Sequence, residues 1–336
     1  MNAGFRDLLD KFIALGGIAD NVCQRVGEYG RGVFPIDSSC MAKIMTPKNL
    51  LVHADNLYLD GDHVVIKDGS GYTSEEIAFL ELYWNDYSWG NSGNNDSASF
   101  LKFITSLEEP IKTQLLTSGF VDTSFLSYRE DNDCLLKRFV SERVVTFENQ
   151  SVLAPVWEFV NHSSFAAPLR ITPYGVETPP MESRSEEILF KYSQKNSPIG
   201  MWMKYGFACD CVFAYSIPFN IDIGDQALAI RCAGRLGLGP KEKSSFSIDG
   251  DILSIKSLPV GCLSVGLPKE NFKSILSSVG LSADVSNRLF PKIREVNLKA
   301  RRDLIDSLRE SGSGSKAQLY KALMYEIELI ESSLIG

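Results

Sequence analysis

Hydrophobic residues recur at helical spacing near the start of the 336-residue chain and again over its last 70 residues. Residues 4–15 place apolar side chains on one face before Gly16-Gly17, a pattern that predicts an amphipathic helix ended by glycine. Near the other end, two apolar stripes predict two antiparallel helices joined by a flexible turn at residues 311–315. The stripes are Leu289, Ile293, Val296, Leu304 and Leu308, and Leu319, Leu323, Ile327, Ile330 and Leu334.

Short apolar runs bounded by glycine and proline predict β-strands on both sides of the middle of the chain. Residues 22–34 are expected to form a strand, a tight turn at Gly30-Arg31-Gly32 and a second strand. Residues 41–52 are expected to form short strands broken at Pro47, and residues 57–66 a hairpin that turns at Asp60-Gly61. Further strands are predicted at 169–172, 187–192, 205–233 and 245–265, with a turn at the glycine-rich residues 234–239.

A helical block interrupts these strands. Thr73-Ser-Glu-Glu76 resembles a capping box, and apolar residues follow it at helical spacing through residue 87. Residues 90–99 are rich in Asn, Ser and Gly and predict a polar loop. Helical patterns then resume at 100–107, 111–116 and 134–147. We therefore expect a helical insertion, about residues 70–148, inside a β domain.

The stretch from Leu153 to Ser163 changes character within a few residues. It begins as an apolar run, too short and too aromatic for an amphipathic helix, which predicts a buried strand or a helix-like turn beside one. It ends in three polar residues, Asn161, His162 and Ser163. Buried polar groups without partners cost about 1–3 kcal/mol each, so we expect something polar to lie against this triplet.

Composition narrows the class of protein. Hydrophobic residues make up 44% of the chain and charged residues 23%, which is typical of a globular protein with room for two domains. A net charge of −8 argues against nucleic-acid binding and mildly favours a basic peptide partner. Neither a signal peptide nor an apolar run near 18 residues is present. We therefore expect no membrane association and a cytoplasmic location, with a nuclear one left open.

Several kinds of active site find no support in the sequence. The seven cysteines form no Cys-x-x-Cys pair, which argues against a structural zinc site and a disulfide framework. With only three histidines, His53, His63 and His162, a multi-histidine metal site is not expected. The nucleophile elbow Gly-x-Ser-x-Gly, the His-Glu-x-x-His pair and the phosphate-binding loop Gly-x-x-x-x-Gly-Lys-Ser/Thr are missing as well.

Three stretches nevertheless follow one another in a fixed order. The first is Gly30-Arg31-Gly32-Val33-Phe34, and the second is Leu153-x-Pro155-x-x-Glu158-x-x-Asn161-His162-Ser163. The third is Tyr192, followed thirteen residues later by Tyr205-Gly206-Phe207. Each is weak by itself. Together they resemble the SET-domain methyltransferases, in the branch typified by the Rubisco large-subunit lysine methyltransferase. The resemblance covers nearly the whole chain, and the Asn-His stretch and the tyrosine spacing are its specific parts.

The resemblance implies S-adenosylmethionine as the cofactor and assigns residues to it. Gly30, Arg31 and Gly32 match the family's first cofactor loop, where glycine lets the backbone approach a ligand closely. Asn161 and His162 match the segment that holds the cofactor in a knot-like crossing. Three more matches complete the expected cofactor set: Arg143 at the cofactor carboxylate, Glu158 where the family usually has Asp, and Phe207 on the adenine.

The resemblance also implies a catalytic role for Tyr192, with Tyr205 lining the channel for the substrate lysine. No metal is required. The transfer needs a neutral amine, and deprotonating a lysine at neutral pH costs roughly 4–5 kcal/mol. A narrow aromatic channel lowers this cost by desolvating the ammonium group. The alternative interpretation of both tyrosines is that they are packed aromatics of a β domain. His162 could equally be a core histidine, and Glu158 a surface acid.

The expected fold class is α+β: a SET fold of small sheets with a helical insertion, plus an all-helical carboxyl-terminal lobe. Residues 1–220 are assigned to the SET domain. Residues 221–336 are assigned to a substrate-binding-like lobe, mainly helical after residue 268. The expected partner is a protein that presents a lysine, and the chain is expected to be a monomer.

Two departures from the family pattern keep other functions open. Asn196-Ser197-Pro198 stands where the family usually carries Ser-Asn, and Ser185-Glu186-Glu187 stands where Gly-Glu-Glu is expected. The altered loop at 194–198 leaves a catalytically weakened, SET-fold protein-binding module as one alternative. A histidine N-methyltransferase is the other.

Overall fold

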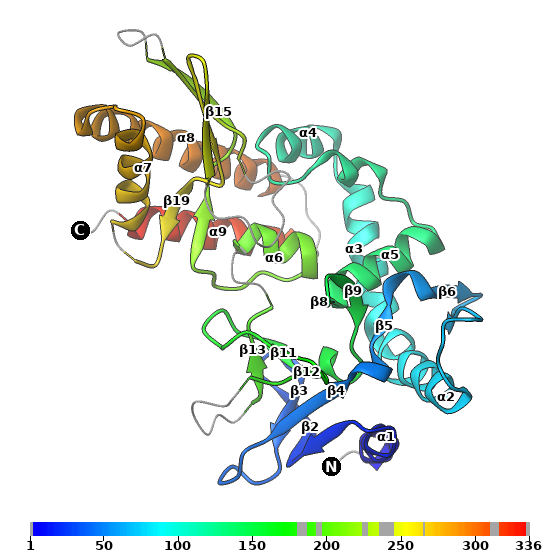
Figure 1. Ribbon diagram of the computed structural model, residues 1–336. Coiled ribbons are helices and arrows are strands. Elements are labelled where there is room, and N and C mark those ends of the chain that lie inside the picture. The colour runs from blue at the N-terminus through cyan, green and yellow to red at the C-terminus, as the bar shows by residue number, and fades with distance from the viewer. Residues whose placement is uncertain are drawn as a thin grey trace. The chain divides into compact units, whose positions relative to one another are not determined.

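Helices and small sheets alternate along the chain in the computed structural model (Figure 1). It describes residues 3–179, 187–192, 197–223, 228–234, 245–264, 266–309 and 316–333. The predicted mixture of helices and small sheets, with a helical carboxyl-terminal part, is confirmed. By packing, the chain divides into a first unit, residues 1–98 and 130–194, and a second unit, residues 99–129 and 195–336. This division by packing does not test the expected domain assignment at residue 220, which stays a prediction.

Small sheets and helices make up the described part of the first unit. Its helices are α1 (Ala3–Ala14), α2 (Ser74–Leu82) and α5 (Asn132–Arg143). A four-stranded sheet has the order β1 (Ile18–Asp20), β4 (Lys43–Pro47), β12 (Gly175–Glu177), β11 (Arg170–Thr172). A three-stranded sheet has the order β5 (Val52–His53), β9 (Gln150–Leu153), β8 (Val144–Phe147). Three strand pairs complete the unit: β2 (Val22–Gly27) with β3 (Gly30–Pro35), β6 (Leu57–Asp60) with β7 (His63–Ile66), and β10 (Asn161–His162) with β13 (Leu189–Phe190).

Local sequence signals place several of these elements correctly. α1 buries Phe5, Leu8 and Phe12 and ends before Gly16, whose φ is +92°. The capping box of α2 is present in full, because the Thr73 side chain accepts from the Glu76 amide and the Glu76 side chain accepts from the Thr73 amide. Such signals lie within a few residues of what they control, which is why the sequence alone predicts them.

Three local predictions are wrong. Gly27 pairs with Gly30 across the β2–β3 hairpin, so the turn lies at Glu28–Tyr29 and Gly30-Arg31-Gly32 belongs to a strand. The helix predicted over 134–147 ends at Arg143, because the β-branched residues that follow pair as strand β8. The polar loop predicted over 90–99 is helical instead, and α3 (Asn94–Ser106) runs through it.

Two consecutive π-helical turns, Tyr83–Tyr87 and Trp89–Gly93, connect α2 to α3. Ser88 lies between them with φ −116° and ψ −88°, outside the helical region. Tyr83 and Trp84 are fully buried in the core of the first unit, where Tyr83 packs edge-on against Phe159. Burial of these large rings holds a backbone that the polar composition of the segment does not favour by itself.

The second unit combines helices with a four-stranded sheet. Its helices are α3 from residue 99 on, α4 (Glu109–Thr117), α6 (Pro198–Tyr205), α7 (Leu267–Ser278), α8 (Ala283–Arg309) and α9 (Lys316–Ser332). The sheet has the order β15 (Phe219–Ile223), β16 (Leu228–Cys232), β18 (Ile252–Lys256), β17 (Ser245–Asp249). β14 (Phe213–Tyr215) pairs with β19 (Pro259–Cys262). Figure 1 shows α8 and α9 side by side, as the two apolar stripes predict. Of those stripes, Val296 is 51% exposed, whereas Leu289, Ile293, Leu304 and Leu308 are buried. Of the predicted turn at 234–239, only Gly234 is described; the predicted turn at 311–315 and Leu334 also lie outside the described residues.

A buried ionic network holds the core of the second unit together. Arg301 on α8 is fully buried, and its Nε and a terminal nitrogen donate to Glu326 on α9 at 2.9 and 2.6 Å. Its other hydrogen bonds go to the side-chain and backbone oxygens of Asn297, both at 3.0 Å, and to the Tyr215 carbonyl at 2.8 Å. Glu326 also accepts from the backbone amide of Ile199 on α6. One ion pair thereby connects α6, β14, α8 and α9.

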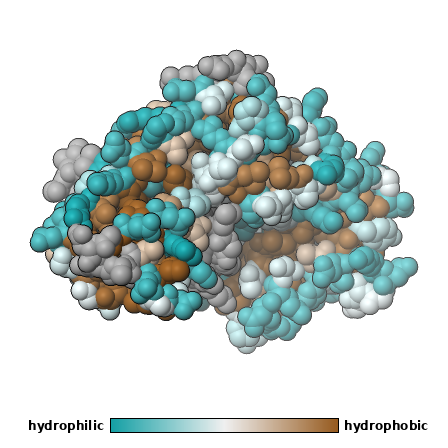
Figure 2. All heavy atoms as spheres, turned by 90° about the horizontal axis from the view of Figure 1, so that it is seen from above, coloured by the Kyte–Doolittle hydropathy of each residue, from teal (hydrophilic) through white to brown (hydrophobic). Residues whose placement is uncertain are grey.

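The surface is mixed. On the face in Figure 2, hydrophilic residues cover much of the surface and hydrophobic areas remain visible between them, as is usual for folded proteins. Within the described part of the chain, no helix is both long enough and apolar enough to cross a membrane.

Candidate functional site

The polar triplet after Val160 lies against the segment that contains Tyr192. Strands β10 and β13 pair in parallel, with Asn161 beside Leu189 and His162 beside Phe190. The Ser163 amide extends this pairing by donating to the Phe190 carbonyl at 3.1 Å. Two short strands from distant parts of the sequence thus bring Asn161, His162 and Tyr192 into one cluster.

His162 positions the backbone of Tyr192. The Tyr192 amide donates to His162 Nδ1 at 3.1 Å, which requires the tautomer with hydrogen on Nε2. That nitrogen then donates to Ser164 Oγ at 3.1 Å. The two rings lie 4.9 Å apart, and His162 is buried. The Tyr192 hydroxyl donates to the Val160 carbonyl at 3.0 Å, so hydrogen bonds fix both ends of the tyrosine.

Gly32 lies directly under a pair formed by Asn161 and Glu187. The Asn161 amide donates to Glu187 Oε1 at 2.7 Å and to the Arg31 carbonyl at 3.2 Å. A Cβ on Gly32 would come within 2.1 Å of that carboxylate oxygen and 2.8 Å of the Asn161 amide nitrogen. Only glycine leaves room at this position, so β3 passes closer to the cluster than a residue with a side chain permits.

Glu187 is the residue of this cluster that the sequence analysis did not assign to the site. It is 8% exposed, and burial raises the pKa of its carboxyl group. Glu28 acts in the same direction, whereas the hydrogen bond from Asn161 opposes the shift. A glutamate two residues before a buried strand is a weak sequence signal. Its place in the cluster depends on the contact with Asn161, 26 residues away.

A second polar cluster surrounds Glu158. Arg143 Nε donates to Glu158 Oε2 at 2.7 Å, and a terminal nitrogen of Arg143 pairs with Glu142 at 2.9 Å. The hydroxyl of Ser88, from between the π turns, also donates to Glu158. Burial disfavours the charged form of Arg143, but the two carboxylates outweigh that effect and raise the pKa of its guanidinium. The sequence analysis identified Arg143 and Glu158, but not Ser88.

Arg31 makes its side-chain contacts within the same unit. Its guanidinium lies over the Phe159 ring, 4.7 Å from the centroid, and donates to the Tyr87 carbonyl at 3.0 Å. Its backbone carbonyl accepts from Asn161. Arg31 therefore touches the Asn161 cluster through its backbone and the π turn through its side chain.

The segment before Glu158 carries backbone strain. Val156, a buried β-branched residue, has φ +72° and ψ −30°. Such a conformation is unusual for valine and costs on the order of 1–3 kcal/mol. The 3₁₀ turn Trp157–Phe159 follows at once and leads into Asn161. Of the two predicted alternatives, a buried strand or a helix-like turn beside one, the second is confirmed, because the 3₁₀ turn follows strand β9. Strain of this kind often accompanies functional sites.

Tyr205 and Phe207 belong to the second unit. Tyr205 is the last residue of α6, and Gly206 ends the helix with φ +78°. The two rings lie 6.0 Å apart, and burial raises the pKa of Tyr205, which keeps its phenol neutral at physiological pH. Ser197 caps α6 through the Gly200 amide. The rest of the altered 194–198 loop before it, and Ser185-Glu186, lie outside the described residues.

The first unit thus offers a glycine cradle, an amide, two carboxylates and an arginine, which fit the charged amino-acid end of a ligand. Among the described residues, no group of three or more His, Cys, Asp and Glu is arranged to hold a metal ion.

Neither a protein-family model nor a curated protein matches the sequence. Among solved structures, the chain is similar to the SET domain of LSMT bound to lysine and AdoHcy. The TM-score is 0.44 at 13% identity, over 99% of this chain and 91% of that one. For the same domain bound to methyllysine and AdoHcy, the TM-score is 0.44 at 14% identity, over 99% of this chain and 91% of that one. For Rubisco LSMT bound to sinefungin and monomethyllysine, the TM-score is 0.44 at 13% identity, over 99% of this chain and 90% of that one. At this level of similarity, function has to be inferred from the residues of the site.

Proposed function

We propose that this chain is an S-adenosylmethionine-dependent methyltransferase of the SET class that methylates a lysine side chain of a protein. The observation that supports this proposal is that residues far apart in sequence meet in the first unit. Arg31 and Asn161 lie 130 residues apart in sequence, and His162 and Tyr192 lie 30 apart, yet each pair is hydrogen-bonded. The resemblance in sequence links these segments to one cofactor site, and their meeting in space supports it.

The donor set fits the cofactor's zwitterionic amino-acid end. Gly32 lets strand β3 lie directly against the Asn161–Glu187 pair, and Arg31 and Asn161 are fixed beside it. Arg143 would hold the carboxylate, with Glu158 keeping the guanidinium oriented. Glu158 and Glu187 supply the negative charge that an ammonium group and a sulfonium favour. Tyr205 and Phe207 remain sequence predictions for the lysine channel and the adenine contact.

The bound cofactor would supply a methyl group on a positively charged sulfur. The residues of the chain would then have two tasks, to make the incoming amine neutral and to aim it. Aromatic rings do the first by excluding water: Tyr192 lies 4.7 Å from Phe190 and 4.9 Å from His162, centroid to centroid. Desolvation lowers the pKa of an amine because it disfavours the charged form. The Tyr192 oxygen and the Val160 carbonyl would aim the amine, which is a positioning role.

Calorimetric titration of the purified chain with S-adenosylmethionine tests the proposal first. We expect saturable binding that Asn161→Ala weakens, whereas Asn56→Ala, in the β5–β6 connection, leaves it unchanged. Labelled cofactor with an extract of source cells, followed by mass spectrometry of modified peptides, then identifies the acceptor as lysine or histidine. Absence of binding by the folded wild type would contradict the proposal.

A protein-binding module without catalysis is the second candidate. The one hydrogen of the Tyr192 hydroxyl is already donated to Val160, which favours a structural role for this tyrosine. Tyr192→Phe separates the two candidates. An enzyme should lose turnover and keep its cofactor affinity. A binding module should lose only the stability of one hydrogen bond, about 1 kcal/mol.

A further inference from the structure

A groove separate from the polar clusters of the first unit runs between strand β15 and helix α8 of the second unit. Its volume is about 520 Å³, and it is lined by all five residues of β15 and by Arg288, Leu289, Lys292, Ile293 and Val296 of α8. Apolar side chains form part of it, among them Leu289, Ile293 and the exposed Val296. A groove of this size accommodates a few side chains of an extended peptide.

Two cations at the α8 side of this groove have no acidic partner. Arg288 and Lys292 are exposed and lie one turn apart, and neither forms an ion pair with any described residue. Asp222 on β15 is the acid that lines the groove. In a chain of net charge −8, a pair of uncompensated cations beside apolar side chains favours an acidic ligand.

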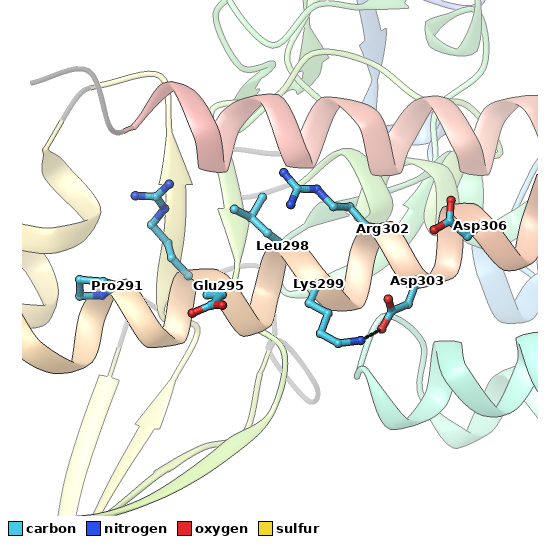
Figure 3. A pocket seen from close by; sticks show the side chains of 8 residues that line it. Pro291, Glu295, Leu298, Lys299, Arg302, Asp303 and Asp306 are labelled. Carbon is cyan, nitrogen blue, oxygen red and sulfur yellow. Dashed lines mark hydrogen bonds and ion pairs between the residues drawn. The ribbon is translucent and has the colours of Figure 1, made fainter.

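The opposite situation occurs further along the same helix. A groove of about 550 Å³ lies there on α8, and Figure 3 shows Glu295, Lys299, Arg302, Asp303 and Asp306 along the helix. Here Lys299 pairs with Asp303 at 2.5 Å, and Arg302 pairs with Glu331 of α9 at 2.6 Å. Because these charges compensate one another, we expect this face to prefer neither acidic nor basic ligands. It therefore provides the control for the β15 groove.

Strand β15 supplies the backbone part of a docking site. It lies at the edge of the sheet and, among the described strands, pairs with β16 alone. An edge strand presents a row of backbone amides and carbonyls that can accept a further strand. Asn220 and Asp222 are exposed along it. Addition of a strand at such an edge, with side chains read by a neighbouring groove, is an established mode of peptide recognition.

We propose that the β15–α8 groove binds an extended acidic segment of another protein by strand addition. The segment pairs with β15 through its backbone. On its α8-facing side, an acidic side chain meets Arg288 and Lys292, and an apolar side chain two residues away contacts Leu289, Ile293 and Val296. This site is independent of the proposed methyl transfer.

Fluorescence anisotropy with a labelled octapeptide tests the proposal. In this peptide every second residue is threonine, and the residues between are glutamate and isoleucine in turn. We expect saturable binding that weakens in high salt, because exposed charge pairs are screened. The double variant R288Q/K292Q should weaken binding about tenfold, the effect of losing both charge contacts. The matched variant K299Q/R302Q, with the same charge change on the same helix, should stay within about twofold. Val296→Asp should weaken binding without unfolding the chain, because Val296 is half exposed.

Hydrogen exchange gives the second readout. Peptide binding should slow exchange of the amides in residues 219–223, a signature that a purely ionic surface contact does not produce. Three results would overturn the proposal. The first is equal affinity for the peptide with lysine in place of glutamate. The second is equal weakening by the two double variants. The third is concentration-dependent dimerisation that protects residues 219–223 without peptide, since a second copy would then occupy the edge.

Discussion

Each unit of the chain contains an arginine–glutamate pair that is shielded from solvent, and the two pairs differ in how completely they are enclosed. In the second unit, the Arg301 and Glu326 side chains are 0% and 2% exposed, and every nitrogen of the guanidinium has a partner. In the first unit, the Arg143 and Glu158 side chains are 17% and 13% exposed. Arg143 also pairs with Glu142, and Glu158 also accepts a hydrogen bond from Ser88.

The difference separates a structural pair from one that can serve a ligand. A fully enclosed pair depends on each partner, because removing one leaves a buried charge without compensation. A partly open pair can exchange one contact for a ligand group at small cost. We therefore expect substitutions at Arg301 to change stability, and substitutions around Arg143 and Gly32 to change binding.

The largest effect should come from the enclosed pair. Arg301→Met leaves Glu326 buried and uncompensated, which should lower the free energy of unfolding by about 3–5 kcal/mol. Denaturant titration followed by tryptophan fluorescence measures it. The double variant R301M/E326M should recover much of the loss, since both charges are then gone. Arg302→Met, which removes a pair with Glu331 that is 57% and 46% exposed, should cost less than about 1 kcal/mol. Equal losses for Arg301→Met and Arg302→Met would contradict the distinction.

Gly32→Ala should have the next largest effect, on binding. The added Cβ displaces the carboxylate of Glu187 and the amide of Asn161. Affinity for S-adenosylmethionine should fall at least about tenfold, which corresponds to 1.4 kcal/mol. Gly61→Ala, at a turn with φ +59° and open space around it, is the matched control. It should leave calorimetric affinity unchanged. Undiminished affinity in Gly32→Ala would remove this glycine from the site.

Glu158→Gln should change stability less than Arg301→Met does. A neutral hydrogen bond to Arg143 replaces a charge-assisted one, so the expected loss is about 1–2 kcal/mol. Cofactor affinity should fall in the same variant, because Arg143 loses the partner that orients it. A thermal shift assay with and without cofactor separates the two quantities. A stability loss as large as that of Arg301→Met would show that the first pair is as enclosed energetically as the second.

The smallest effect should be a change in pH dependence at Glu187. Burial raises its pKa from an ordinary value near 4.5, so folding favours the protonated form. The resulting stabilisation is complete below pH 4.5 and is lost as the pH rises through the raised value. Glu187→Gln stays neutral and keeps the hydrogen bond to Asn161. Its melting temperature should therefore depend less on pH than that of the wild type between pH 4.5 and neutrality. Parallel curves for both proteins would contradict this.

Sequence reasoning succeeded where a signal is local. The Thr73–Glu76 capping box lies at the start of α2, and Gly16 lies just after the end of α1. Both signals are within a few residues of the helix end that they determine. It failed at residues 90–99, because asparagine, serine and glycine predict a loop by themselves. Ser97 is nevertheless fully buried in α3, so packing overrode local preference there.

Part of the candidate site was predictable, and part depends on contacts between distant residues. The proximity of Asn161, His162 and Tyr192 followed from resemblance to a family. Glu187 and Ser88 did not, since their importance lies in partners 26 and 70 residues away. Arg301 had an overlooked signal: polar Asn297 and Arg301 continue the apolar face of Ile293, Leu304 and Leu308 at helical spacing. A charged residue on such a face predicts a buried partner.

In the segment with the two π turns, Tyr83–Gly93, the number of residues determines which contacts the following residues can make. A π turn holds about one residue more than an α turn, whose residues advance by about 100° each. Deleting one residue from Tyr83–Tyr87 would let an α-helical ladder continue. It would also rotate everything that follows, taking the Tyr87 carbonyl away from Arg31 and the Ser88 hydroxyl away from Glu158. The segment should tolerate many substitutions at its exposed positions and no single-residue deletion.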